Sequence, residues 1–305
     1  MNPIATRAEV DDFYVSTAEE LLDMLSPRHA LWRDDPTGWI YRGQSNAAWE
    51  LQPSAYRNTV DAFARVGIRV QMTADAPDWS VRGNLQDKLL TRFGDALDRS
   101  GIPIPAPNPE LDSRRSRRIT TSAEPAQQLY PLMALAQHHR LPTMLLDWSR
   151  RALVAAYFAA AEAADESKHA SMATSEPLTH VAVWALYRAR RHAADGGLIF
   201  FEAPASTNPN LRAQDGLFTV LPPSDADDRS VEQYLERMAK VMKHVAPNVD
   251  GKVAPLRRIM LPVSETKKLL RLLSYEGVTG ASMFPGADGV VRAMREMVLW
   301  DQPPT

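Results

Sequence analysis

Residues 137–149 read Gln-His-His-Arg-Leu-Pro-Thr-Met-Leu-Leu-Asp-Trp-Ser. The apolar part of this run, residues 144–146, predicts a short buried strand that ends in Asp-Trp-Ser. Residues 150–162 are mainly Ala, Leu, Val, Tyr and Phe, so they are apolar nearly all round and predict a buried helix. Another predicted helix begins at Pro125 and ends at the two histidines. The run therefore predicts helices packed against a sheet.

The rest of the chain predicts further elements around this centre. Amphipathic spacing of apolar residues indicates helices, and short apolar runs between turn residues indicate strands. Helices are expected at 17–25, 84–98, 230–244, 265–275 and 288–297, and strands at 39–42, 180–187, 198–202, 217–220 and 257–261. The predicted fold class is α+β (mixed α/β), with a central mixed sheet flanked by helices in a single domain over residues 1–305.

Three helix ends carry recognisable signals. Ser16 and Glu19 have the spacing of a capping box at the start of the first helix. Ser264 can cap the helix at 265–275, and Gly277 can end that helix.

Composition limits the class of protein. The chain has 35 Lys and Arg against 37 Asp and Glu, so its net charge of −2 gives no overall attraction to nucleic acid or to an anionic membrane. It has no Cys, which excludes disulfides and thiolate zinc sites. The N-terminus lacks the apolar core of a signal peptide, and no apolar run approaches the roughly 20 residues that span a bilayer. We therefore expect a soluble, cytoplasmic protein without a membrane partner.

Residues 101–124 differ in composition from their surroundings. They contain four prolines at alternate positions, followed by the basic cluster Arg114-Arg115-Ser116-Arg117-Arg118. We interpret this segment as an exposed insertion within the single domain. The basic cluster could contact nucleic-acid phosphates. The alternative is a solvated basic loop, because no aromatic residues are interleaved with the arginines.

The segment Tyr41-Arg42-Gly43-Gln44 ends a predicted strand. A guanidinium in this place can direct its donors at a phosphate, while the neighbouring glycine lets the backbone approach closely. The alternative is that Arg42 pairs with an internal carboxylate and holds a turn.

His138, His139 and Asp147 are the other polar candidates in the central run. Neighbouring histidines on one element point in different directions, and the chain offers no His-x-x-x-His or Cys partner, so we expect no metal. One histidine can cap the helix C-terminus while the other packs. Asp147 either caps the helix that follows or acts directly in a site.

Together these motifs resemble the FRG domain family. The matching segments are Tyr-Arg-Gly-Gln at 41–44, the run at 137–149 with its Ala-x-x-Phe-Ala helix, Ala-Gln-x-Gly-x-Phe at 213–218 and Phe-Pro-Gly at 284–286. The family is named for a Phe-Arg-Gly signature, in which Tyr41 here keeps an aromatic ring. Met144 stands where the family usually has a basic residue.

The order of these motifs is similar to that of ADP-ribosyltransferases of the arginine, serine, glutamate type. The resemblance implies an ADP-ribosyltransferase-like split sheet, with NAD as substrate and no metal. It implies that Arg42 grips the NAD phosphates and that residues 147–149 support the nicotinamide ribose. The implied catalytic residues are Arg42, His138, Asp147 and Gln214. The implied NAD-binding residues are Tyr41, Gly43, Gln44, His139, Thr143, Trp148 and Ser149.

Gln214 departs from the transferase pattern, which has a glutamate in that place. An amide can hydrogen-bond a ribose hydroxyl, but it does not supply the negative charge that stabilises a developing cation. Either another acid supplies that charge (Asp147, Asp215 or Glu202), or the site binds NAD-like ligands without this chemistry. His138 is our candidate for a base toward the acceptor, because the pKa of histidine is near neutral.

The resemblance also implies partners. A transferase of this kind modifies a macromolecular acceptor, either a nucleic acid or a protein. FRG-type proteins resemble components of bacterial conflict systems, which implies a toxin or phage-defence effector with a neutralising partner protein. The alternative function is a non-catalytic module that binds a nucleotide or a nucleic acid.

Overall fold

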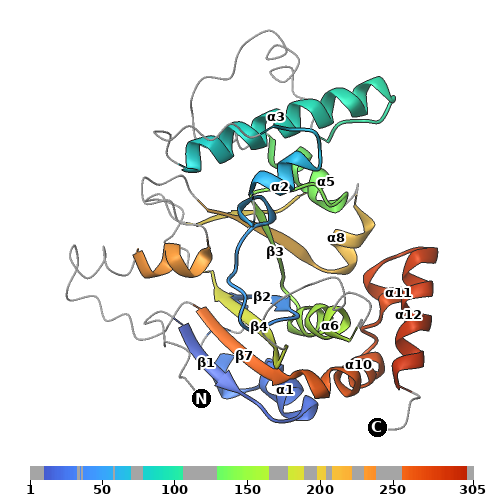
Figure 1. The fold of residues 1–305 in the computed structure, drawn as a ribbon. Helices are drawn as coiled ribbons and strands as arrows, with labels where there is room; N and C mark the ends of the chain where they lie inside the picture. Colours follow the sequence, from blue (N-terminus) through green and yellow to red (C-terminus); the bar gives the residue numbers. More distant parts are fainter. Residues whose placement is uncertain are drawn as a thin grey trace.

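The computed structural model describes residues 10–32, 35, 37–57, 59–69, 78–105, 129–164, 178–188, 198–203, 208–221, 230–237 and 256–300. These residues form a seven-stranded mixed sheet flanked by helices, which confirms the predicted mixed α/β class (Figure 1). The strands are β1 (Val10–Tyr14), β2 (Trp39–Gln44), β3 (Leu145–Ser149), β4 (His180–Tyr187), β5 (Ile199–Phe201), β6 (Gly216–Val220) and β7 (Leu256–Pro262). The helices are α1 (Ala18–Leu25), α2 (Thr59–Ala64), α3 (Asp78–Arg99), α5 (Tyr130–His138), α6 (Ala152–Ala163), α8 (Pro209–Ala213), α10 (Thr266–Tyr275), α11 (Gly280–Met283) and α12 (Ala287–Trp300).

The sheet divides between its fourth and fifth strands. The strand order is β1-β7-β4-β2-β3-β6-β5, and only β1 and β7 run parallel. β2 pairs with β4 along its whole length, whereas its pairing with β3 is the single bridge between Tyr41 and Ser149. Beyond that bridge no further residues of β2 and β3 pair with each other, although all seven strands belong to one sheet.

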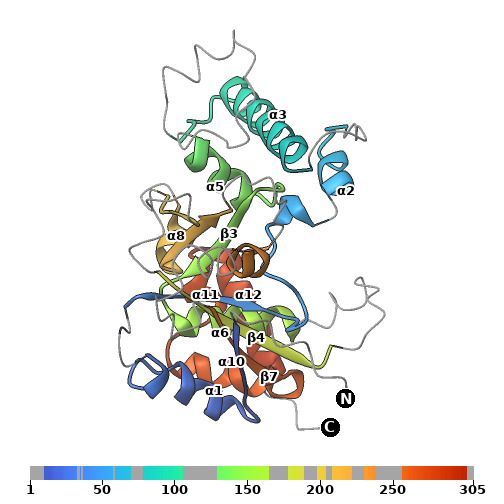
Figure 2. The same ribbon diagram turned by 90° about the vertical axis from the view of Figure 1, so that its left-hand side faces the viewer.

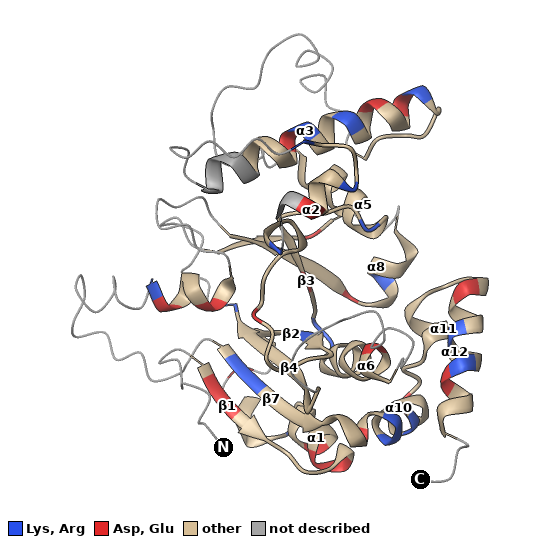
Figure 3. Cartoon of the chain, viewed as in Figure 1, with Lys and Arg blue, Asp and Glu red and all other residues tan. Residues whose placement is uncertain are grey.

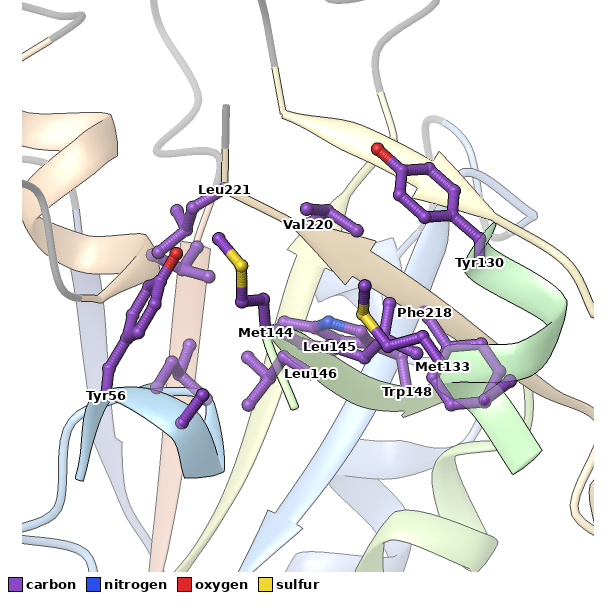
Figure 4. Close-up of a cluster of buried hydrophobic side chains, with 14 of the residues drawn as sticks. Tyr56, Tyr130, Met133, Met144, Leu145, Leu146, Trp148, Phe218, Val220 and Leu221 are labelled. Carbon is purple, nitrogen blue, oxygen red and sulfur yellow. The ribbon is translucent and has the colours of Figure 1, made fainter. Parts of the chain in front are cut away.

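Two hydrophobic clusters lie around the sheet. One covers β3 and β6 and includes Trp148, Phe218 and Met133 of α5 (Figure 4). The other holds α1, α6 and α10 against β2, β4 and β7. Figures 1 and 2 show α2, α3 and α5 at one end of the molecule, with α1 and α10 at the other. The cavity described below lies between these ends.

Helix α6 is buried and packs directly on β2. A Cβ at Gly43 would lie 1.9 Å from the carbonyl oxygen of Ala155 and 2.6 Å from the amide nitrogen of Ala159. Glycine is therefore required here because a helix crosses the strand, which is a different reason from the close ligand approach that we predicted. On the other side of α6, the Tyr157 hydroxyl donates to buried Glu296 of α12. These contacts fix the position of α6 relative to the cavity.

Two predicted helix caps were wrong. The hydroxyl of Thr17, not Ser16, accepts the hydrogen bond from Glu20 N at the start of α1, and the Glu20 carboxylate accepts from Ser16 N. Ser264 lies inside a short 3-10 turn, so α10 begins at Thr266 without a side-chain cap. Gly277 does follow α10 with a φ of +71°, as its role as a terminator requires.

Several predicted bounds also changed. The strand predicted at 144–146 is β3, which runs from Leu145 through Asp-Trp-Ser to Ser149. The helix predicted at 150–162 is α6, which begins two residues later, at Ala152. β1 was not predicted, because its two aspartates hide the strand pattern. The prolines at 107 and 109 and the basic cluster of the predicted insertion lie outside the described residues, as do 125–128 and 238–244 of two predicted helices. Among the helices that the structure describes, none is long and apolar enough to cross a membrane.

Candidate functional site

A cavity of about 310 Å³ lies where β2 and β3 separate. Side chains and backbone from β2, β3, α5, α6 and α8 line it, together with Gln214, Phe218 and Phe284. This volume is at the lower end of the range of small-molecule sites, about 300–1,000 Å³.

The cavity brings together residues that are far apart in the sequence. The four predicted catalytic residues line it: Arg42, His138, Asp147 and Gln214. Of the predicted NAD-binding residues, Tyr41, Gly43, Trp148 and Ser149 also line it, whereas Gln44, His139 and Thr143 do not.

Arg42 crosses the gap between the two strands. Its Nη1 donates to the backbone oxygen of Asp147 at 2.9 Å and lies 3.5 Å from the Oδ2 of the same residue. Its Nε is buried without a hydrogen-bond partner, and its Nη2 bonds to none of the described residues. A buried unpaired donor is uncommon and costs free energy. The guanidinium is thus hydrogen-bonded at one nitrogen, while Nε and Nη2 have no partner among the described residues.

Asp147 belongs to a short chain of hydrogen bonds. Its Oδ1 accepts from Gln137 Nε2 at 2.6 Å, and Gln137 Oε1 in turn accepts from the Thr143 hydroxyl. Thr143 is fully buried, so it supports the site from behind the cavity wall. Capping of α6 was the first of our two interpretations of Asp147, and it was wrong, because no side chain caps this helix. The Asp147 side chain is 56% exposed and faces the cavity.

Ser149 and Gln214 connect the strand β3 to the far wall. The Ser149 hydroxyl donates to Gln214 O at 2.7 Å and accepts from Arg151 N at 2.9 Å, one residue before α6 begins. The Gln214 amide donates to Met283 O at 3.1 Å. Gln214 therefore lines the cavity and also holds α11 in place.

The two histidines have different surroundings. His138 is the last residue of α5 and lines the cavity. His139 is outside the lining, and its ring lies 6.4 Å from that of Phe93. Burial lowers the pKa of His138 below its usual 6.5, and the neighbouring His139 lowers it further. His138 is therefore neutral at physiological pH and can accept a proton.

Of the three acids that could replace the charge of a glutamate at position 214, Asp147 lines the cavity and the other two do not. Asp215 and Glu202 both pair with Arg150, with a distance of 3.3 Å for Asp215, and neither lines the cavity. A carboxylate that we did not predict, Glu162 of α6, does line it. The spacing of Ala155, Phe158 and Glu162 places them on one helix face. That spacing is the signal that could have identified Glu162.

A second arginine lies near Arg42. Arg57 is exposed to solvent, and its Nε donates to Gln52 O at 2.9 Å. Partial desolvation by the surrounding protein lowers the pKa of Arg57, and the positive charge of Arg42 lowers it further. The negative charges of Asp147 and Glu162 raise this pKa. Two guanidinium groups and two carboxylates therefore influence one another in this region.

Aromatic rings form an apolar wall. The rings of Phe158 and Phe284 pack edge to face with centroids 5.9 Å apart, and the guanidinium of Arg292 lies 4.0 Å from the Phe284 centroid. Phe284 of the late Phe-Pro-Gly motif thus reaches the cavity. Tyr41 is buried with its ring 5.5 Å from Trp32, and burial raises the pKa of its hydroxyl to about 12.

The remaining predicted residues have contacts within the core. Gln44 is buried, accepts from Trp184 Nε1 at 2.7 Å and donates to Glu50 O at 3.1 Å. Trp148 donates from its ring nitrogen to Thr219 at 2.9 Å, inside the cluster of Figure 4. Among the described residues there is no group of three or more His, Asp or Glu that could hold a metal ion.

Part of this site lies in a segment that matches a known domain. The model of the FRG domain matches residues 37–168. The chain contains an FRG domain. The matched region of the FRG domain includes β2, α5, β3 and α6, which carry Arg42, His138, Asp147 and Glu162. Gln214 and Phe284 lie beyond it and complete the cavity. No curated protein and no solved structure matched the chain.

Proposed function

We propose that the cavity binds NAD and that the protein transfers ADP-ribose from NAD to a macromolecular acceptor. The observation that carries this proposal is the convergence of Arg42, His138, Asp147 and Gln214, from separate segments, on one cavity. The sequence predicted a role for each of them in such a reaction, and together they line one cavity of small-molecule size. The acceptor is either a protein or a nucleic acid.

Arg42 holds the phosphates of NAD in this proposal. A planar guanidinium can form two parallel, charge-assisted hydrogen bonds to phosphate oxygens. The contact with the backbone oxygen of Asp147 fixes the orientation of the Arg42 side chain before the ligand arrives. Preorganisation of this kind reduces the entropy that binding costs.

His138 accepts the proton of the acceptor. Its lowered pKa keeps the imidazole neutral at physiological pH, which a general base requires. The nearby apolar wall of Phe158 and Phe284 keeps water away from the reacting atoms.

Transfer from labelled NAD tests the proposal. The wild-type protein is incubated with labelled NAD and with either nucleic acid or cell lysate, and label in the macromolecular fraction is measured. We expect transfer by wild type, and loss of at least 10-fold in NAD affinity for Arg42→Ala, since a charged hydrogen bond contributes about 1.5–3 kcal/mol. Arg271→Ala is the matched control, because Arg271 lies on α10 and its side chain bonds only to Tyr275 among the described residues. Equal transfer by wild type and Arg42→Ala, or no transfer by either, would exclude the proposal.

A non-catalytic nucleotide-binding module is the second candidate. The observation that favours it is Gln214, which carries no charge and whose amide is already bound to Met283 O. Under this alternative, wild type binds NAD in an Arg42-dependent way but releases no nicotinamide.

A role as a bacterial toxin or phage-defence effector is a further part of the proposal. It predicts that induction of the wild-type protein slows growth and that Arg42→Ala at equal soluble level does not. Equal growth under both inductions contradicts the toxin role.

A further inference from the structure

We infer that Glu162 is the catalytic carboxylate of the cavity, which replaces the glutamate that Gln214 does not provide. This inference rests on the proposed function. It assigns the negative charge to helix α6 instead of to the strand region where the motif order would have it. Nothing in the motif pattern pointed to this residue.

The position of Glu162 is the first argument. Glu162 lines the cavity together with Ala155 and Phe158, which lie on the same face of α6. It is exposed, and it forms no hydrogen bond or ion pair with any other residue that the structure describes. A carboxylate with free acceptor atoms beside a cavity can interact with a bound ligand without first breaking another contact.

The state of the other acids is the second argument. Asp147 lines the cavity, but one of its oxygens accepts from Gln137 and the other lies 3.5 Å from Arg42 Nη1. One oxygen of Asp147 is thus engaged by Gln137, and its charge is partly balanced by the nearby guanidinium of Arg42. Asp215 and Glu202 are paired with Arg150 and do not line the cavity. Among the described residues that line the cavity, Glu162 is the carboxylate whose oxygens have no partner.

The helix that carries Glu162 is fixed on two sides. Gly43 allows the backbone of α6 to lie against β2, and Tyr157 bonds to buried Glu296 of α12. The carboxylate therefore starts from a rigid backbone. A ligand that fills the cavity would cover Glu162 and lie against the rings of Phe158 and Phe284, which removes water and strengthens the interaction of a charge with a developing cation.

The reaction step assigns a defined role to this charge. The bond between ribose C1′ and the nicotinamide nitrogen breaks, and both of its electrons stay with the nitrogen, so that neutral nicotinamide leaves. Positive charge develops on C1′ and the ring oxygen, where the Glu162 carboxylate stabilises it. A lone pair of the acceptor forms the new bond to C1′, and the acceptor proton passes to His138.

The test compares Glu162→Gln with Glu276→Gln, an exposed control at the end of α10. Binding of labelled NAD is measured by equilibrium dialysis, and nicotinamide release is measured separately. For Glu162→Gln we expect NAD affinity within about 3-fold of wild type and a roughly 100-fold to 1,000-fold slower release, the size expected for loss of one preorganised electrostatic contact. Glu162→Asp keeps the charge and should be faster than Glu162→Gln. Glu276→Gln should match wild type in both measurements.

The outcomes separate the two proposals. If Glu162→Gln releases nicotinamide within about 3-fold of wild type while Arg42→Ala loses NAD binding, Glu162 is not the catalytic carboxylate and the proposed function stands. If wild type binds NAD without releasing nicotinamide, the transferase proposal and the role of Glu162 both fall. If Glu162→Gln loses NAD affinity as strongly as release, Glu162 is a binding residue and the inference is wrong.

Discussion

Two arginines that face aspartates across strands differ in how completely they are paired. Arg258 of β7 donates from Nε and Nη2 to both oxygens of Asp12 on β1, at 2.8 and 2.6 Å, and from Nη1 to Ala47 O at 3.0 Å. Figure 3 shows the acidic segment of β1 beside the basic segment of β7. Arg42 uses Nη1 alone, leaves Nε unpaired, and faces Asp147 at 3.5 Å.

This difference separates an arginine whose donors are all engaged from one that keeps unpaired donors among the described residues. Both side chains are largely buried, with exposed fractions of 11% for Arg258 and 16% for Arg42. Their partners differ, because Asp12 is 13% exposed and Asp147 is 56% exposed. Arg258 is fully paired with an internal carboxylate, whereas Arg42 has one long ion pair and one hydrogen bond to a backbone oxygen, so the alternative that Arg42 pairs with a carboxylate stays open. Two arginines of similar burial therefore differ in how many of their donors are satisfied.

The largest expected effect on stability is at Arg258. Arg258→Ala leaves Asp12 as an unpaired, mostly buried charge, so we expect a loss of about 3–5 kcal/mol in the free energy of unfolding. Arg42→Ala should cost less than Arg258→Ala, since it removes one hydrogen bond and one long ion pair and leaves behind a carboxylate that is 56% exposed. Urea unfolding of both variants measures the difference. Similar losses would remove the distinction between the two arginines.

The next effect is expected at Gly43, which joins β2 to α6 beside Arg42. Gly43→Ala places a methyl group 1.9 Å from the carbonyl oxygen of Ala155, and the helix has to move. We expect a loss of about 1–3 kcal/mol, the usual cost of overpacking, and weaker NAD binding because the cavity wall shifts. Gly94→Ala of α3 is a control, since a Cβ there would lie 3.5 Å from the nearest atom, an ordinary contact distance, and its φ is not positive. A Gly43→Ala protein as stable as wild type would contradict the close packing.

A smaller effect is expected for the two aspartates. Asp12→Asn removes the charge that Arg258 needs, whereas Asp147→Asn leaves the contact of Arg42 with the backbone oxygen intact. We expect Asp147→Asn to cost less than about 1 kcal/mol in unfolding free energy, and Asp12→Asn to cost more. Thermal and urea unfolding of the pair provides the measurement. The reverse order would show that the exposed pair carries more stability than its geometry indicates.

The smallest expected effect is a pH dependence confined to the cavity. The pKa of His138 lies below 6.5 in the folded protein, so the unfolded chain takes up this proton at higher pH than the folded one does. The contribution of neutral His138 to the free energy of unfolding is therefore fully present above about pH 6.5. It is lost as the pH falls toward the pKa of His138 in the folded protein. Transfer should also decline over that acidic range, and His138→Gln should lose this decline. An unchanged pH profile in His138→Gln would mean that another group titrates.

Most of the secondary structure could be predicted from local pattern. β4 has the bounds 180–187 that alternation predicted, and α6 is apolar on nearly every side, as its composition required. β1 was missed because Asp11 and Asp12 interrupt the apolar pattern, and Asp12 is compensated by Arg258, which lies more than 200 residues later. A pattern within one segment contains no information on such a distant partner.

The sequence by itself determined the fold class, the family motifs and the group of polar residues around Arg42. The tertiary structure decided which members of that group share a cavity. His138 lines the cavity and its neighbour His139 does not. Asp215 and Glu202 pair with Arg150, and Glu162 lies on the cavity wall. The reason is physical: periodicity reports which face of an element is apolar, but the packing of α6 on Gly43 and the separation of β2 from β3 fix what each polar side chain meets.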